Sequence, residues 1–151
     1  MYDVVIVGAG ITGCAAARFL SGYSGRFCVM ERSEDVCTGT SKANSAIIHA
    51  GFDAAHGSLM AKYNLLGCRM YPGLSKELDF DYKNNGSLVL ALSEEDIPKL
   101  HALMENGIKN GVERLEIVGQ ERLRELEPSI GHVPVAALYA PTAGIVCPFQ
   151  N

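Results

Sequence analysis

The sequence predicts an α/β fold in which a parallel βαβ unit precedes an α+β region with antiparallel strands. Three observations lead to this prediction. An apolar run at 4–7 enters a glycine-rich turn at 8–13, followed by a small-residue helix pattern and a second apolar run at 27–30. A long polar segment, 32–58, then replaces the helix and strand that a simple crossover unit would add next. From residue 79, short alternating runs separated by turn residues indicate antiparallel strands.

The glycines of the first turn have separate roles in a phosphate-binding junction between strand and helix. Gly8 permits a tight turn, and Gly10 lets the backbone approach a pyrophosphate without a Cβ in the way. Gly13 lets the helix pack closely against the sheet. The helix start at Ile11 and Thr12 offers unpaired N–H groups and the positive end of the helix dipole. The spacing therefore predicts an incomplete Rossmann-like nucleotide site, with an ordinary strand–helix turn as the alternative.

Glu31 closes the second apolar run, about 20 residues after Gly10, where dinucleotide-binding units carry an acidic residue. Its carboxylate can accept hydrogen bonds from the hydroxyls of an adenosine ribose. A negative charge there would repel a 2′-phosphate, which argues against NADP. The motif alone leaves NAD and FAD open.

Composition excludes several function classes. A net charge of −4 and a pI near 5.5 give no electrostatic case for nucleic-acid binding. No apolar run approaches the roughly 20 residues that span a bilayer, and no leader pattern precedes the first strand. The cysteines form no CxxC pair, so neither a disulfide scaffold nor a metal site is expected. Cys14 and Cys28 are expected to be small core residues.

Residues 58–92 are predicted to form a helix and a hairpin. The helix covers 58–78, with an interruption at Pro72 and Gly73. Its predicted buried stripe consists of Leu59, Tyr63, Leu66, Met70 and Leu74. Asn84-Asn85-Gly86 separates two alternating runs, and Asn-Gly in that position predicts a hairpin.

Residues 93–146 continue the α+β pattern. A helix capped by Asp96 or Ser93 ends at Gly111, and its predicted buried face is Ile97, Leu100, Leu103, Met104 and Ile108. A strand at 115–118, a charged helix at 120–126 and strand pieces at 135–139 and 145–146 follow. We expect a nucleotide-binding segment 1–78, the start of a substrate domain 79–142 and a return segment 143–151, which the chain leaves incomplete.

Several motifs resemble those of a known family. Gly39-Thr40-Ser41-Lys42-Ala43-Asn44-Ser45, followed by Ile48-His49-Ala50-Gly51, resembles the flavin-contacting loop of D-amino-acid-oxidase-like FAD oxidoreductases. Within that superfamily the chain is most similar to the anaerobic-type glycerol-3-phosphate dehydrogenase group. Asn85-Gly86-Ser87-Leu88, Glu127-Pro128 and the run from Ala140 to Pro148 match the same group. A complete member would be considerably longer, so the chain is expected to be an N-terminal part.

The resemblance implies FAD as the cofactor, with Gly8, Gly10 and Gly13 at the pyrophosphate, Glu31 on the adenosine ribose and Arg32 near the adenine. Residues implied along the pyrophosphate and ribityl chain are Thr40, Ser41, Asn44 and Ser45, whose short polar side chains suit such contacts. His49 and Gly51 are implied to lie against the isoalloxazine, and His49 is the candidate catalytic residue. Turn formation, helix capping and a structural histidine are the alternative roles.

These implications predict an oxidoreductase that oxidises a small polar substrate by hydride transfer to flavin. Glycerol 3-phosphate is the favoured substrate, and an L-2-hydroxyglutarate-type enzyme and an amino-acid oxidase are rivals within the superfamily. The sequence shows no cluster of Arg and Lys that would bind a phosphate substrate. Two alternatives from other classes are a non-catalytic nucleotide-binding fragment and a plain NAD-binding protein, which the long Ser/Asn loop disfavours.

Partner predictions follow from surface and composition. Apolar surface on an unfinished sheet and unpaired strand edges predict self-association. We expect a cytoplasmic protein with a small-molecule substrate and no nucleic-acid partner. Peripheral membrane contact of the complete protein and the identity of the electron acceptor stay open.

Overall fold

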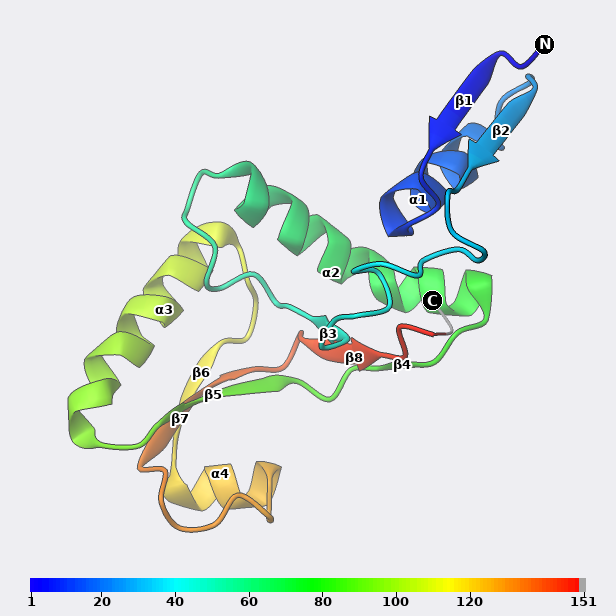
Figure 1. The fold of residues 1–151 in the computed structure, drawn as a ribbon. Helices are drawn as coiled ribbons and strands as arrows, with labels where there is room; N and C mark the ends of the chain where they lie inside the picture. The colour runs from blue at the N-terminus through cyan, green and yellow to red at the C-terminus, as the bar shows by residue number, and fades with distance from the viewer. Residues whose placement is uncertain (150–151) are drawn as a thin grey trace. The chain divides into compact units, whose positions relative to one another are not determined.

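The computed structural model describes residues 1–149 and separates into two compact units, which divide between Ser45 and Ala46 (Figure 1). The predicted segments 1–78, 79–142 and 143–151 do not coincide with this division, because the helix α2 (Leu59–Leu78) belongs to the second unit. Residues 150 and 151 of the return segment lie outside the described residues. As a description of the domains, the three segments remain a prediction.

The first unit contains the predicted βαβ arrangement. Strand β1 (Val4–Val7) leads to helix α1 (Ile11–Leu20) and then to strand β2 (Phe27–Met30). The strands are parallel, with Val4 opposite Phe27 and Val7 opposite Met30. A two-stranded parallel sheet leaves much of its surface uncovered, and the side chain of Val7 is 87% exposed. Cys14 and Cys28, predicted as core residues, are both only partly buried.

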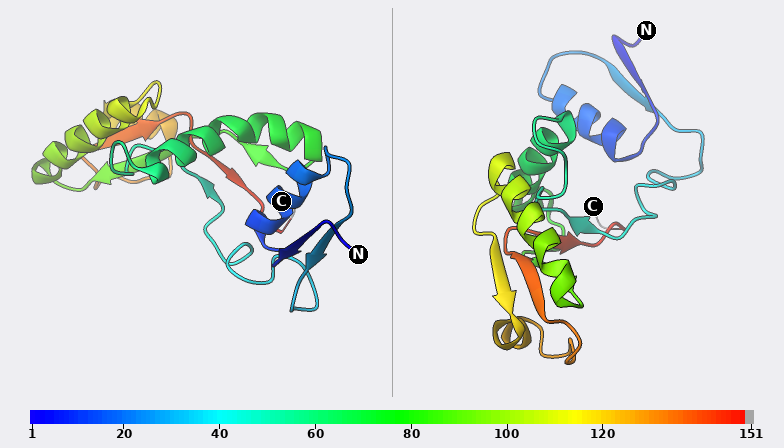
Figure 2. Two further views of the ribbon diagram at one scale, coloured as in Figure 1. Left: turned by 90° about the horizontal axis from the view of Figure 1, so that it is seen from above. Right: turned by 90° about the vertical axis from the view of Figure 1, so that its left-hand side faces the viewer.

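A three-stranded antiparallel sheet forms the centre of the second unit. Its order is β5 (Ser87–Ala91), β7 (Ala136–Ala140) and β6 (Glu116–Gly119). Successive side chains of β7 point to opposite faces. Leu138 therefore joins the cluster around Leu100 of α3 (Ile97–Asn110), whereas Ala137 joins that around Leu123 of α4 (Gln120–Leu126). Helix α3 lies along this sheet in both views of Figure 2.

The predicted hairpin at Asn84–Gly86 is wrong. Strand β4 (Tyr82–Lys83) pairs with β8 (Gly144–Val146), and β3 (Ile47–Ile48) pairs with the other edge of β8, whereas β5 belongs to the larger sheet. The Asn84 amide donates hydrogen bonds to the carbonyl oxygens of Pro141 at 2.8 Å and Ala143 at 2.6 Å. These bonds hold the chain where it passes from one sheet to the other, so Asn84 does not form a two-residue turn.

Helix α2 exists as predicted but buries a different face. Its N-terminus is capped by Ser58, whose hydroxyl oxygen accepts a hydrogen bond from Ala61 N–H at 3.1 Å, and the helix continues through Pro72. Four residues of the predicted stripe, Leu59, Tyr63, Leu66 and Met70, are exposed. The buried residues are the smaller Ala61 and Cys68, with Leu65 packed against the core.

Helix α3 follows its prediction more closely. A 3-10 turn at Glu94–Asp96 precedes it, Asp96 is the N-cap residue, and Gly111 ends it in the left-handed conformation. Ile97, Leu100, Leu103 and Met104 face the core, whereas Ile108 is 57% exposed. In residues 1–149, none of the helices combines the length and apolar character that crossing a membrane requires.

Candidate cofactor site

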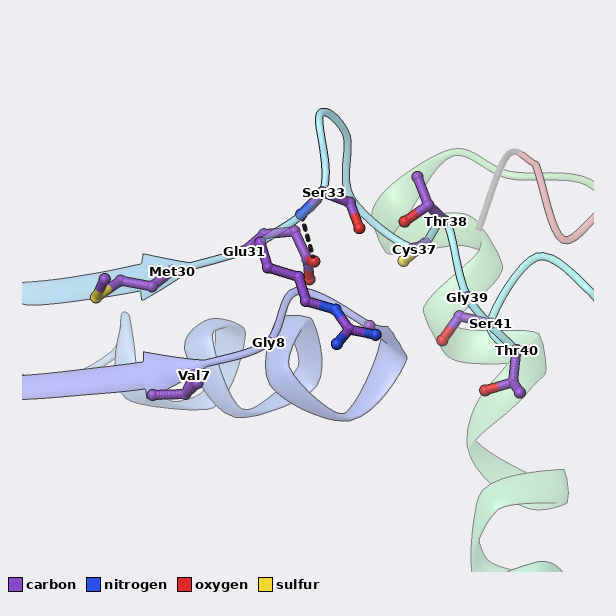
Figure 3. Close-up of a pocket in the computed structure, with 12 residues that line it drawn as sticks. Val7, Gly8, Met30, Glu31, Ser33, Cys37, Thr38, Gly39, Thr40 and Ser41 are labelled. Carbon is purple, nitrogen blue, oxygen red and sulfur yellow. Dashed lines mark hydrogen bonds between the residues drawn. The ribbon is translucent and has the colours of Figure 1, made fainter.

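A cavity of about 530 Å³ lies in the first unit at the carboxyl ends of β1 and β2 (Figure 3). Open α/β sheets place their ligands at this edge. Four segments contribute to the cavity: the end of β1, the glycine turn, the end of β2 and the loop that follows β2. The lining residues are Val7, Gly8, Gly10, Met30, Glu31, Arg32, Ser33, Cys37, Thr38, Gly39, Thr40 and Ser41.

The glycine turn has the tight geometry that the sequence predicts. Gly8 has a φ of +100°, in the region that favours glycine. A Cβ on Gly13 would overlap the carbonyl oxygen of Gly8, so α1 starts directly against the end of β1. A Cβ on Gly10 would lie 3.1 Å from the hydroxyl oxygen of Ser41, which shows that the loop after β2 closes over the turn.

Glu31 joins the glycine turn to the end of β2. Its Oε2 accepts the N–H of Ala9 at 2.8 Å and its Oε1 accepts the N–H of Ser33 at 2.9 Å, the second bond being drawn in Figure 3. These hydrogen bonds hold the pKa of the Glu31 carboxyl below its usual range, and the bond from Ala9 has the largest effect. Each oxygen of an ionised carboxylate has a further lone pair, so Glu31 can also accept hydrogen bonds from a pair of ligand hydroxyls.

The start of α1 presents hydrogen-bond donors to the same cavity. The hydroxyl oxygen of Ser41 accepts the N–H of Ile11 at 3.0 Å, which directs the hydroxyl proton of Ser41 elsewhere. The N–H groups of Thr12 and Gly13 have no acceptor among residues 1–149. The first turn of α1 contains no acidic residue. Such a set of donors at a helix N-terminus suits a phosphate or pyrophosphate.

The structure thus brings only part of the predicted site together. Arg32 and Thr40 line the cavity, and neither Asn44 nor Ser45 does. The Asn44 amide donates to the carbonyl oxygens of Thr40 at 3.1 Å and Ser41 at 2.8 Å, so it supports the loop from within. Capping or turn-forming contacts of this kind are the alternative role that such side chains have in loops.

His49 and Gly51 belong to the second unit and do not line this cavity. His49 follows β3 and is exposed, whereas Gly51 is buried with a φ of +103°. Asn110 of α3 donates to the carbonyl oxygens of Gly51 at 3.0 Å and Ala54 at 2.8 Å. Asn106, one turn earlier, donates to the carbonyl oxygens of Phe52 at 2.7 Å and Ala54 at 2.8 Å.

Asn106 and Asn110 are positioning residues that the sequence analysis does not identify. Together they hold the segment 51–54 against α3. Their signal in the sequence is a pair of asparagines four positions apart within a helix, where asparagine is not a favoured residue. Among the described residues, no group of three potential ligands that could hold a metal ion is present.

The model of the family described as "DAO: FAD dependent oxidoreductase" matches residues 3–150. The chain belongs to this family. Membership confirms the predicted superfamily and the α/β fold, and it confirms FAD, the cofactor on which the family depends, over NAD. The curated proteins related to this member include a dehydrogenase and an oxidase.

Three known proteins show how this family member relates to others. It is 45% identical to a glycerol 3-phosphate dehydrogenase of Caloramator mitchellensis, over 99% of this chain and 31% of that protein. It is 37% identical to a mitochondrial L-2-hydroxyglutarate dehydrogenase of Nematostella vectensis, over 96% of this chain and 32% of that protein. The FAD-bound structure of L-α-glycerophosphate oxidase from Mycoplasma pneumoniae superimposes with a TM-score of 0.87 at 32% identity, covering 97% of this chain and 39% of that one. The chain therefore spans about a third of the curated relatives' length.

Proposed function

We propose that the protein containing this chain is an FAD-dependent dehydrogenase or oxidase that oxidises glycerol 3-phosphate. The observation that carries this proposal is the 45% identity to a glycerol 3-phosphate dehydrogenase, which extends over 99% of the chain. The second candidate substrate is L-2-hydroxyglutarate, because the dehydrogenase of Nematostella vectensis is 37% identical over nearly the same residues.

The cavity of the first unit is the proposed site for the adenosine diphosphate half of FAD. Glu31 would accept hydrogen bonds from the ribose hydroxyls, and Arg32 would lie toward the adenine. The hydroxyl proton of Ser41 and the free N–H groups at the start of α1 would face the pyrophosphate. A cavity of about 530 Å³ is within the usual range for a site of this kind.

Gly8, Gly10 and Gly13 would form the turn beneath the pyrophosphate, with Thr40 beside it. Asn44 and Ser45 would continue toward the ribityl chain, Asn44 through the loop that it supports. His49 and Gly51 are proposed to lie against the isoalloxazine, where the exposed imidazole of His49 could hold a proton. When bound, FAD would supply the acceptor for two electrons of the substrate.

Anaerobic reduction of the bound flavin tests the choice of substrate. The purified holoprotein is mixed with glycerol 3-phosphate or with L-2-hydroxyglutarate, and the visible absorption of the flavin is followed. We expect glycerol 3-phosphate to bleach the flavin at a much lower concentration. Bleaching by L-2-hydroxyglutarate alone would reverse the assignment, and bleaching by neither would overturn both.

A further inference from the structure

Two cysteine thiols lie side by side at the glycine turn and have no part in the proposed function. Cys14 belongs to the first turns of α1, and Cys37 belongs to the loop after β2. Cys37 lines the cavity, where Figure 3 shows it between Ser33 and Gly39. Both thiols are free and partly buried, so solvent reaches the residues that carry them.

One backbone oxygen brings the two thiols together. The carbonyl oxygen of Ala9 accepts hydrogen bonds from Cys14 Sγ at 3.5 Å, from Cys37 Sγ at 3.4 Å and from Cys37 N–H at 2.9 Å. Burial raises the pKa of the Cys14 thiol, and the neighbouring Cys37 raises it further. The two sulfur atoms therefore share one small volume between α1 and the loop.

The backbone of Cys37 is held in an uncommon conformation. Its φ is 59°, in the left-handed region where glycine or asparagine is usual. This conformation directs both the amide and the thiol of Cys37 to the same oxygen of Ala9. Glycine at position 37 would adopt this backbone conformation equally well. Cysteine adds a thiol next to Cys14.

We propose that Cys14 and Cys37 are a disulfide-forming pair that links α1 to the loop at 33–41 when the protein meets a low-molecular-weight disulfide. The thiolate of Cys37, on the cavity side, attacks one sulfur of the reagent; their S–S bond breaks and one thiolate leaves. Cys14 then loses its proton, attacks the Cys37 sulfur and displaces the second thiolate. Two protein S–H bonds are lost, one S–S bond forms, and the reagent takes up two electrons and two protons as two thiols.

The disulfide would tie α1 to the loop that lines the cavity. Cys14 lies within the helix whose first N–H is bonded to Ser41, and Cys37 lines the cavity four residues before Ser41. A consequence for cofactor exchange rests on the proposed FAD site. The adenosine diphosphate half of FAD would leave only when the loop at 33–41 moves away from α1. Oxidation is therefore expected to slow the release of FAD.

Peptide mapping tests the disulfide directly. The protein is incubated with oxidised glutathione, free thiols are blocked with iodoacetamide, and trypsin is added. Trypsin cuts after Arg18, Arg26, Arg32 and Lys42, so that Cys14, Cys28 and Cys37 fall in different peptides. We expect peptide 1–18 linked to peptide 33–42, a link that dithiothreitol removes and that C14S and C37S both lack.

Cys28 is the internal control, because it belongs to the neighbouring strand β2 and its thiol is bonded instead to Val29 O at 3.8 Å. Alkylation of Cys14 and Cys37 to the same extent as Cys28 would overturn the proposal, and so would a link between Cys14 and Cys28. The half-life of FAD release, measured before and after oxidation, tests the consequence. It should lengthen in the wild type and stay constant in C14S.

An unchanged half-life in a protein that carries the linked peptide would refute the effect on FAD exchange while leaving the disulfide in place. A protein that holds no FAD at all would contradict the proposed function instead. The peptide map needs no cofactor, so it decides the disulfide in that case as well.

Discussion

Gly13 lies where α1 crosses the end of β1, and an added Cβ would overlap the carbonyl oxygen of Gly8. We expect Gly13→Ala to lower the free energy of unfolding by about 1–3 kcal/mol, as overpacking does, and to weaken FAD binding. Gly67→Ala is the matched control, because Gly67 also lies within a helix and a Cβ there would meet no atom within 4 Å. It should stabilise the protein by about 0.5–1 kcal/mol. If denaturant unfolding showed the same change in the free energy of unfolding for Gly13→Ala and Gly67→Ala, the close packing at Gly13 would be contradicted.

Glu31 makes stability depend on pH in a defined direction. Its pKa is lowered in the folded protein by the hydrogen bonds from Ala9 and Ser33, so its contribution is complete above the ordinary pKa of a glutamate. That contribution is lost as the pH falls through the lowered pKa. Thermal unfolding of Glu31→Gln should therefore show a lower midpoint than the wild type at neutral pH and no difference in strong acid. Glu34→Gln, at an exposed neighbour, is the control and should follow the wild type throughout.

Individual site residues differ in how far the sequence reveals them. The tight turn at Gly8 and Gly13 is local, and Glu31 follows it at a known spacing after the next strand, so all three are predictable from the sequence. The role of Ala9 cannot be read from the sequence, because its backbone N–H and carbonyl oxygen make the hydrogen bonds and its side chain makes none. Whether the predicted residues contact FAD stays a prediction, which Ser41→Ala and Glu31→Gln would test by FAD affinity.

The link between α3 and the segment 51–54 depends on two side-chain amides. Asn106 and Asn110 each donate two hydrogen bonds to partly buried carbonyl oxygens. We expect Asn106→Ala and Asn110→Ala each to lower the unfolding free energy by about 1–3 kcal/mol, because both leave carbonyl groups without donors. Because both amides donate to the carbonyl oxygen of Ala54, the loss of unfolding free energy in the double variant should differ from the sum of the two single losses.

Lys109→Ala provides the control for these variants, since it changes an exposed residue of the same helix. Hydrogen exchange of the 51–54 amides would locate the effect. If both asparagine variants unfold at the wild-type denaturant concentration, these hydrogen bonds do not hold the segment.

Strands and helices of this chain show what local pattern predicts and where it fails. The positions of β1, α1, β2, α3 and α4 follow from periodicity and capping, which act within a few residues. The hairpin prediction failed because Asn84 is bonded to Pro141 and Ala143, far away in the sequence. The predicted buried stripe on α2 is wrong because the small residues Ala61 and Cys68 face the core. The periodicity of large apolar residues does not reveal which face of the helix is buried.

For the whole molecule, exposed apolar residues on β1 and β2 predict self-association of the 151-residue chain. Val5 and Val29 are 45% and 41% exposed on a sheet that, within residues 1–149, has two strands and unpaired outer edges. Sedimentation velocity should show a mass that rises with protein concentration. In the double variant Val5→Thr/Val29→Thr this rise should be smaller, because Thr keeps the strand preference and reduces apolar surface. A monomer at every concentration would be inconsistent with this prediction.

The most direct test of the proposed FAD site is a calorimetric titration of the cofactor-free protein with FAD and with FMN. FMN carries the same isoalloxazine but lacks the adenosine half for which the cavity of the first unit offers Glu31, Ser41 and the start of α1. We expect FAD to bind far more tightly than FMN. Equal affinities, or no binding of FAD, would contradict the assignment of this cavity to the adenosine diphosphate half.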